Sequence, residues 1–243
     1  MPRLFNDQSP RTKLRILSIA ARWLFILCLP ILLISATIGW AVNSAWLYKY
    51  GFQKYDVGQT TGLAEVELES AATGIISYFN SGDEDISLTV MKDGEPFDLF
   101  NDQEIDHLRD VKNLIWLDYW TLLAALVYTL GYVAVSLRWW KDWRRMIQGV
   151  VMGSGITLAL MLALGLGIFL GFDQLFWQFH IISFTNELWQ LDPSTDYLIM
   201  LFPRDFWYDA AVFCALSTSG IALVIGGAAG GYLLSTRRRH VSH

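Results

Sequence analysis

Four apolar runs, each long enough to cross a lipid bilayer, constrain this 243-residue chain more than any other feature. A helix needs about 20 mainly apolar residues to cross a hydrocarbon core of roughly 30 Å. Charged residues are rare inside the runs, and Asp118, the one acid, lies close to an end. The sequence therefore predicts an all-α integral membrane protein with four transmembrane helices. We place these helices at 14–42, 115–137, 146–170 and 210–234.

The first run has a second interpretation, as a cleavable signal peptide. The apolar region of a signal peptide is about 7–15 residues long, whereas this run continues from 14 to 42. The length favours an uncleaved membrane anchor. Cys28 and Cys214 both fall inside apolar runs, so we expect them to pack as small apolar side chains and not to form a disulfide framework.

Basic residues concentrate on one side of the predicted membrane. Twelve of the 18 Lys and Arg residues lie near the two ends of the chain or in the 138–145 loop, and 21 of the 23 acids lie elsewhere. The positive-inside rule then places the tails 1–13 and 235–243 and this loop in the cytoplasm, with 43–114 and 171–209 outside. The acidic outer segments exclude nucleic acid as an expected partner.

The first outer segment, 43–114, is too short to bury a large core of its own, so we expect it to pack against the membrane helices. Its pattern predicts a helix over 60–80 and a small β-hairpin, with strands over 86–91 and 97–100 joined by the turn sequence KDGEP. Asn101 and Glu104 then form a capping-box pattern. The helix that it opens carries His107 and continues into the second transmembrane helix.

The second outer segment, 171–209, is rich in aromatic residues and contains an uncharged stretch that is too short to cross the membrane. A further crossing would also reverse the charge topology. We therefore expect a helix that lies at the outer surface or re-enters it. The glycines of the flanking runs predict close packing of these two helices with each other, in preference to a channel lining.

His107 and His180 are the candidate catalytic residues, one on each outer segment. Histidine titrates near neutral pH and transfers protons in both directions, which suits acid–base catalysis. The alternative is two unrelated histidines at the membrane interface, each with its polar tip in water.

Polar residues near His180 allow two interpretations. Asp192 and Asp196 either build the turn LDPSTD or orient a histidine. Asn186 either donates to a developing oxyanion or caps the preceding helix.

A metal set of both histidines with Asp192 or Glu104 is only weakly indicated, because no HxxxH or HxH spacing occurs. No GxSxG pattern indicates a catalytic serine.

Two stretches, FHIISFTNELWQLDPSTDYLIMLFP and EIDHLRDVK, resemble a family of bacterial four-span membrane proteins. The family includes the lipoprotein intramolecular transacylase of Gram-positive bacteria, and the resemblance covers nearly the whole chain. It implies an enzyme that acts on a diacylglyceryl lipoprotein in the bacterial plasma membrane. One acyl chain moves from the glycerol oxygen to the α-amine of the N-terminal cysteine, which gives the lyso form.

The resemblance matches the two functional histidines of the family to His107 and His180, at the extracytoplasmic face. It implies no cofactor and no metal. The candidate substrate-binding residues are Asn186, Trp189, Asp192 and Asp196. The roles of the two histidines as base and acid stay open, as does the oligomeric state. Two other functions also stay open: a non-catalytic scaffold and a metal-dependent membrane hydrolase. Spans almost free of charge disfavour a transporter.

Overall fold

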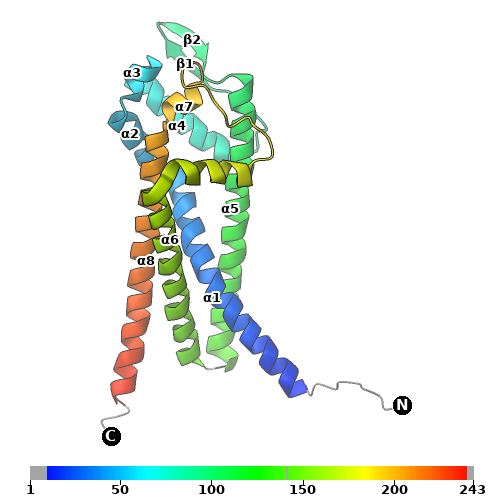
Figure 1. Ribbon diagram of the computed structural model, residues 1–243. Coiled ribbons are helices and arrows are strands. Elements are labelled where there is room, and N and C mark those ends of the chain that lie inside the picture. Colours follow the sequence, from blue (N-terminus) through cyan, green and yellow to red (C-terminus); the bar gives the residue numbers. More distant parts are fainter. Residues whose placement is uncertain (1–9, 141, 240–243) are drawn as a thin grey trace. The chain divides into compact units, whose positions relative to one another are not determined.

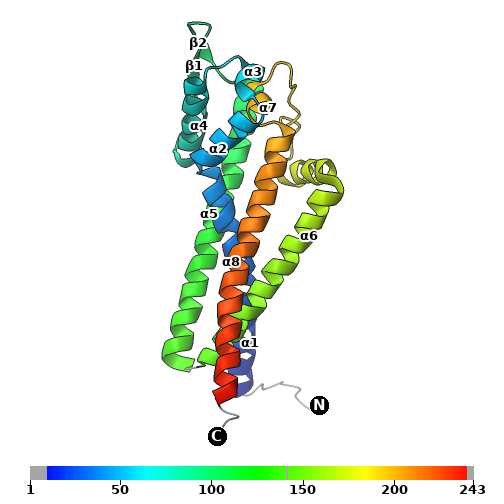
Figure 2. The ribbon, with the colours of Figure 1, turned by 90° about the vertical axis from the view of Figure 1, so that its left-hand side faces the viewer.

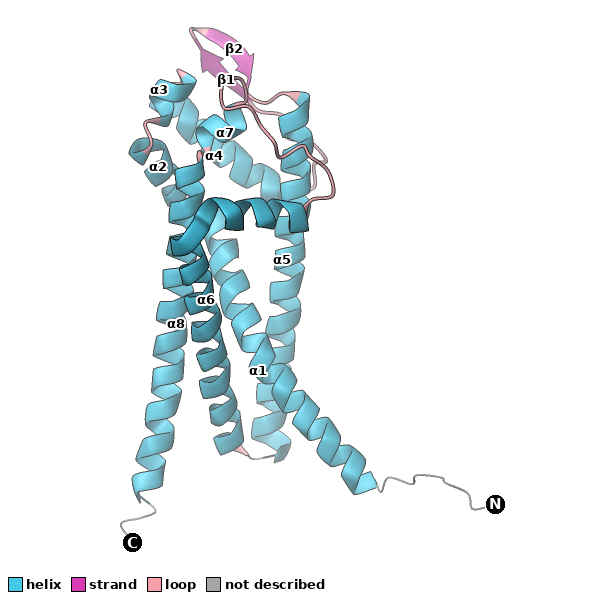
Figure 3. Cartoon of the chain, viewed as in Figure 1, coloured by secondary structure: helices cyan, strands magenta, loops and turns pink. Residues whose placement is uncertain are grey.

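The computed structural model describes residues 10–140 and 142–239 and is almost entirely helical (Figure 1). Its one sheet among these residues is a two-stranded hairpin, as Figure 3 shows. The predicted tails 1–13 and 235–243 lie partly outside the described residues. The elements are α1 (Pro10–Val42), α2 (Ala45–Lys54), α3 (Val57–Thr61), α4 (Glu65–Asn80), β1 (Thr89–Lys92), β2 (Glu95–Asp98), α5 (Asp102–Val135), a π-helix (Ser136–Trp140), α6 (Trp143–Ser183), α7 (Tyr197–Leu201) and α8 (Arg204–Arg239).

Helices α1, α5, α6 and α8 are each long and apolar enough to cross a membrane. At most 33% of the most apolar part of any of them is buried inside the protein, so most of their apolar surface faces outward. Such a surface is stable only in contact with lipid. The predicted fold class, an all-α membrane protein with four transmembrane helices, is confirmed.

The chain forms two compact units, and each of the four long helices contributes to both. The first unit comprises Met1–Ile34, Thr121–Leu160 and Thr218–His243. Its core contains Phe25 of α1, Tyr132 of α5 and Ile147 of α6. The rings of Phe25 and Tyr132 are stacked with their centroids 4.4 Å apart.

Glycines allow close helix contacts in the first unit, but chiefly between α6 and α1. A Cβ atom on Gly149 would lie 2.9 Å from the Phe25 ring, and one on Gly153 would lie 2.8 Å from the Cβ atom of Leu29. Gly226 of α8 lies against Ser154 of α6 in the same way. The i, i+4 spacing of Gly149 and Gly153 gives α6 a small-residue face that α1 occupies. The predicted close packing of α6 with α8 occurs at Gly226, but most α8 glycines have no atom close to them.

The connection between α5 and α6 is shorter than the predicted loop 138–145. The π-helix extends the chain to Trp140, and α6 begins at Trp143. Asp142 caps α6, because its Oδ1 atom accepts a hydrogen bond of 3.1 Å from the Arg145 backbone N–H.

The second unit comprises Ser35–Trp120 and Met161–Ser217. Its core brings Phe52 of α2 and Ile75 of α4 together with Leu201 of α7 and Phe206 of α8. This arrangement confirms that the segment 43–114 shares its core with other helices, because its own apolar residues are too few.

Two local predictions in this segment need correction. The predicted helix 60–80 is divided at Gly62, whose φ of 71° ends α3 before α4 begins. The hairpin strands are shifted, with Thr89 opposite Asp98 and Lys92 opposite Glu95. Asp93 and Gly94 alone form the turn, both with positive φ, because an Asp-Gly pair favours a two-residue turn.

The predicted capping box at the start of α5 is confirmed. The Asn101 backbone N–H donates to Glu104 Oε2 at 2.8 Å, and the Glu104 backbone N–H donates to Asn101 Oδ1 at 3.0 Å. Glu104 Oε1 also accepts a hydrogen bond of 2.6 Å from the Leu198 backbone N–H. One buried carboxylate therefore fixes both the start of α5 and the position of α7.

Helix α6 bends sharply at Gly171, where its backbone leaves the helical conformation. Beyond the bend, the limb Phe172–Ser183 lies across the direction of the preceding turns and ends beside α5 (Figure 1), and Figure 2 shows this limb nearly end-on. The limb is only about 18 Å long, too short to cross a bilayer. It buries Phe172 and His180 and exposes Trp177, Phe179 and Ile182. These features are those of a helix lying at a membrane surface.

Candidate active site

The two candidate histidines lie next to each other in the second unit. His107 is on α5, near the capping box, and His180 is on the limb of α6. Their ring centroids are 6.3 Å apart and their planes differ by 29°. Both side chains are buried, with 7% and 8% of their surface exposed. Two unrelated interfacial histidines, with their polar tips in water, would not be buried together.

Aromatic side chains surround the histidine pair. The Phe176 ring lies 4.5 Å from the His180 ring, and Trp189 lies 4.9 Å from it on another side. Phe184 lies edge-on to His107 at 5.2 Å. The pair therefore occupies a largely apolar environment, in which charged groups are disfavoured.

One hydrogen bond fixes the tautomer of His180. Its Nδ1 atom lies 2.8 Å from the Phe176 carbonyl oxygen, four residues earlier on the same helix. A carbonyl oxygen only accepts hydrogen bonds, so Nδ1 carries the proton and the neutral ring has a lone pair on Nε2. The His107 Nδ1 atom is buried without a hydrogen-bond partner among the described residues.

Both histidines favour the neutral state. His107 precedes the apolar run that starts at 115, and His180 follows the bend at Gly171, so both lie outside the predicted transmembrane segments. Burial and, to a smaller extent, the nearby His180 lower the pKa of His107 to about 4, while Asp110 partly opposes the change. Burial also lowers the pKa of His180, against the bond to Phe176. At neutral pH the site therefore contains two uncharged imidazoles.

Asn186 and Trp189 lie at the same site and connect it to Asp110 of α5. The Trp189 indole N–H donates to the Asn186 carbonyl oxygen at 3.0 Å. The Asn186 side-chain amide donates to Asp110 Oδ2 at 2.7 Å. Asp110 follows His107 by three residues on α5, so the two side chains lie on one face of the helix. Sequence reasoning missed Asp110, although this spacing from His107 is visible in EIDHLRDVK.

Asp192 and Asp196 hold the loop that precedes α7. Asp192 Oδ1 accepts hydrogen bonds from the Ser194 backbone N–H and hydroxyl, which lower the pKa of Asp192. Asp196 accepts hydrogen bonds from the Asp192 backbone N–H and from the Asn101 amide. These contacts agree with the interpretation in which Asp192 and Asp196 build the LDPSTD turn. None of them involves a histidine.

The alternative metal set of both histidines with Asp192 or Glu104 is not assembled in the described part of the chain. No three His, Cys, Asp or Glu side chains there are grouped so that they could hold a metal ion. Glu104 and Asp192, the two carboxylates considered for that set, make the hydrogen bonds described above with backbone and serine groups.

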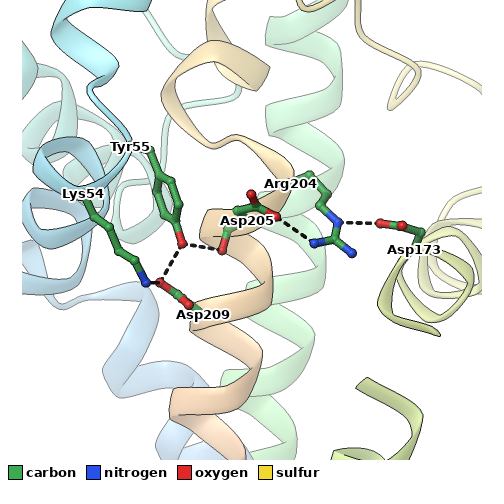
Figure 4. Close-up of polar contacts among 6 residues, drawn as sticks. All are labelled: Lys54, Tyr55, Asp173, Arg204, Asp205 and Asp209. Carbon is green, nitrogen blue, oxygen red and sulfur yellow. Dashed lines mark hydrogen bonds and ion pairs between the residues drawn. The ribbon is translucent and has the colours of Figure 1, made fainter. Parts of the chain in front are cut away.

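The beginning of the His180 limb is tied to the beginning of α8. Arg204 pairs with Asp173 on the limb and with Asp205 on α8, as Figure 4 shows. The Arg204 guanidinium also lies over the Phe172 ring, 5.0 Å from its centroid. Phe172 in turn stacks on Phe176, the residue whose carbonyl accepts from His180. Arg204 is therefore connected to the catalytic candidate through two aromatic residues.

A second polar group holds α8 against α2. The Tyr55 hydroxyl lies 2.7 Å from Asp209 Oδ2 and donates to the Asp205 carbonyl oxygen at 2.9 Å, and Lys54 pairs with Asp209 (Figure 4). Since the same turn of α8 carries Arg204, these contacts help to set the position of the limb of α6.

Comparison with known proteins gives consistent results. Residues 23–207 match the family described as lipoprotein intramolecular transacylase Lit. An uncharacterised protein of Aquifex aeolicus is 28% identical over 158 residues, which are 63% of this chain and 66% of that protein, just under two thirds of its length.

Solved structures of Lit from Bacillus cereus share the fold. One has a TM-score of 0.78 at 19% identity and covers 92% of this chain and 98% of its own. Another, with one histidine replaced by alanine, has a TM-score of 0.76 at 19% identity and covers 95% and 100%. Because the family match spans well over half of the sequence, this chain belongs to the lipoprotein intramolecular transacylase family.

Proposed function

We propose that this protein transfers one acyl chain of a diacylglyceryl lipoprotein from a glycerol oxygen to the α-amine of the N-terminal cysteine. The main support is the buried pair His107 and His180, two neutral imidazoles brought together from separate outer segments. Family membership supports the same reaction. The expected location is the bacterial plasma membrane, with both termini cytoplasmic and the histidine pair at the extracytoplasmic face.

The reaction needs no nucleophile from the enzyme, because the substrate supplies both amine and ester. A proton leaves the ammonium, and the amine nitrogen then bonds to the ester carbonyl carbon. The bond from that carbon to the glycerol oxygen breaks, and a second proton lost by the nitrogen ends on the glycerol oxygen. The products are an amide and a hydroxyl group, with one proton released to water. The enzyme holds the amine and the ester next to each other, so the reaction proceeds as if their concentration were very high.

His180 is the base in this proposal. Its Nδ1 atom is occupied by the bond to the Phe176 carbonyl oxygen, so Nε2 presents the lone pair that accepts the proton of the ammonium. His107 is then the group that stabilises the oxyanion or passes a proton to the glycerol oxygen. This division assigns a separate role to each histidine, which the sequence leaves open.

The remaining candidates bind or support the substrate. Trp189, packed on His180, and Asn186 are proposed to contact the lipid-modified cysteine. Asp192 and Asp196 are proposed to support substrate binding indirectly, because they hold the turn that follows Trp189. The exposed aromatic and aliphatic side chains of the limb Phe172–Ser183 keep the acyl chains at the depth of the histidines.

Mass spectrometry of the N-terminal peptide of a diacyl lipoprotein tests the proposal. The lipoprotein is co-expressed with the wild-type protein, with His107→Ala or with His180→Ala. The wild type is expected to move one acyl chain to the cysteine nitrogen without a change in mass, and both variants are expected to leave the diacyl form. An unchanged diacyl form with well-expressed wild-type protein would contradict the proposal and favour the scaffold function.

A further inference from the structure

We propose that Asp110 binds the α-ammonium of the lipid-modified cysteine and thereby selects substrates with a free amine. This inference rests on the proposed transacylase function and adds a specificity-determining residue to the same site. The catalytic histidines account for proton transfer, but neither supplies a charge that could recognise an ammonium group before the reaction.

Asp110 lies where such a residue is needed. It is half-buried on α5, three residues after His107, and it is close enough to influence the pKa of that ring. Its Oδ2 atom accepts the hydrogen bond from Asn186, and Asn186 in turn accepts from Trp189, which packs on His180. A chain of contacts through Asn186 and Trp189 thus connects the carboxylate to His180 and, through it, to His107.

Among the described residues, no Lys or Arg forms an ion pair with Asp110. The two basic residues nearest to it in the sequence have other contacts. Arg109 pairs with Asp85 and Asp106. Lys112 donates to the Asp83 carbonyl oxygen at 2.6 Å and lies over the Tyr78 ring, 4.2 Å from its centroid. A carboxylate beside an apolar, aromatic site is costly unless a cation pairs with it.

The other acids near the site already have partners. Both Glu104 oxygens accept backbone hydrogen bonds, from Asn101 and Leu198. Asp192 accepts hydrogen bonds from Ser194, and Asp196 accepts them from the Asp192 backbone N–H and the Asn101 amide. Glu187, next to Asn186 in the sequence, is exposed to solvent, whereas Asp110 is half-buried and bonded to Asn186. No ion pair among the described residues balances the charge of Asp110.

The chemistry of the reaction explains why such a carboxylate is useful. An ammonium has three N–H groups, so one can bind Asp110 while another points to the His180 Nε2 atom. Hydrogen bonds between charged groups are the strong ones. After transfer the nitrogen belongs to a neutral amide, so the ion pair is lost and the product binds less tightly than the substrate. A lipoprotein that is already N-acylated has no ammonium group to pair with Asp110, so it would bind weakly for the same reason.

The test compares binding of two synthetic probes to the full-length protein in detergent micelles. One probe is a diacylglyceryl-cysteine peptide with a free α-amine, and the other is the same peptide with its amine acetylated. The wild type is expected to prefer the free amine by roughly 10- to 100-fold, the range for a hydrogen bond to a charged group. Asp110→Asn is expected to abolish this preference. Equal binding of the two probes by the wild type overturns the proposal.

Two control variants make the comparison specific. Asparagine at 110 can still accept from Asn186, so Asp110→Asn removes the charge and keeps the local contact, and its binding of the acetylated probe shows an intact site. Asp106→Asn removes a carboxylate from the same helix that already pairs with Arg109, and it should keep the full preference. An Asp110→Asn protein that retains the wild-type preference also overturns the proposal.

The binding test can fail independently of the test of transacylase activity. A wild-type protein that prefers the free amine but forms no lyso product would contradict the transacylase function and leave the ammonium site in place. A protein that forms the lyso product but does not distinguish the probes would contradict only the role of Asp110.

Discussion

The imidazole Nδ1 atom of His180 donates a hydrogen bond of 2.8 Å to the carbonyl oxygen of Phe176. This one contact orients the ring and leaves the Nε2 lone pair free to act as a base. It depends on the helical limb after Gly171, since a carbonyl four residues earlier is within reach only in a helix.

Replacing His180 by asparagine separates the hydrogen bond to Phe176 from the role of Nε2 as a base. The asparagine amide can still donate near the position of Nδ1, but it has no basic nitrogen. We expect His180→Asn to fold and to lose roughly 100- to 10,000-fold in turnover, the usual contribution of a general base. The rate of lyso-lipopeptide formation measures the effect, with the melting temperature as a control for folding. Turnover within a few-fold of wild type would exclude His180 as the base.

The pH dependence of turnover follows from the lowered pKa of His180. The base must be neutral, and a lowered pKa keeps it neutral at pH values where a free histidine is already protonated. We therefore expect the acid limb of the kcat/KM profile, which reports the free enzyme, to lie below pH 6.5, the ordinary histidine value, with activity lost as the pH falls further. An acid limb at or above that value would contradict the assignment. A pH series with the lipopeptide substrate measures it.

Arg204→Ala is expected to loosen the limb of α6 without unfolding the protein. Arg204 and Asp173 are both well exposed, so their ion pair contributes at most about 1 kcal/mol to stability. Its loss should speed hydrogen exchange of the amides in Phe172–Ser183 and reduce turnover, because His180 is on this limb. Arg138→Ala, an exposed arginine of the π-helix, is the matched control. Unchanged exchange in the limb would show that the aromatic contacts alone hold it.

Glu104→Ala should destabilise the protein markedly. The change leaves the backbone N–H groups of Asn101 and Leu198 without their acceptor, at a cost of about 1–3 kcal/mol for the buried Leu198 group and less for the exposed Asn101. A lower melting temperature in detergent tests this expectation. Glu95→Ala, at an exposed position of the hairpin, should have almost no effect. Equal melting temperatures for the two variants would contradict the structural role of Glu104.

Two glycines of α6 give a matched pair for helix packing. Gly153→Ala places a Cβ atom 2.8 Å from the Leu29 Cβ and 2.9 Å from the Ile26 carbonyl oxygen, so we expect a loss of about 1–3 kcal/mol. Gly155→Ala meets no atom within 4 Å and should cost nothing. Unfolding titrations in denaturing detergent compare the two. A Gly155→Ala protein that is as unstable as Gly153→Ala would argue against the contact of α6 with α1.

Sequence reasoning was most successful where a pattern is local. The apolar runs, the capping box of Asn101 and Glu104 and the turn around Asp192 all depend on residues a few positions apart. It was less successful at the hairpin, where the two-residue turn of Asp93 and Gly94 shifts both strands. It predicted the close packing of α6 with α8 but missed the contacts of Gly149 and Gly153 with α1, because a row of glycines does not specify which helix packs against it.

The sequence by itself determined the membrane-spanning helices, the two histidines and the aromatic segment that follows the bend, because hydropathy and side-chain chemistry are properties of the residues themselves. Only the tertiary structure decided that His107 and His180 meet at 6.3 Å, that His180 is fixed by Phe176 and that Asp110 joins them through Asn186. These relationships link positions more than 70 residues apart or depend on the turn of α6 at Gly171. They arise from packing, which no local pattern encodes.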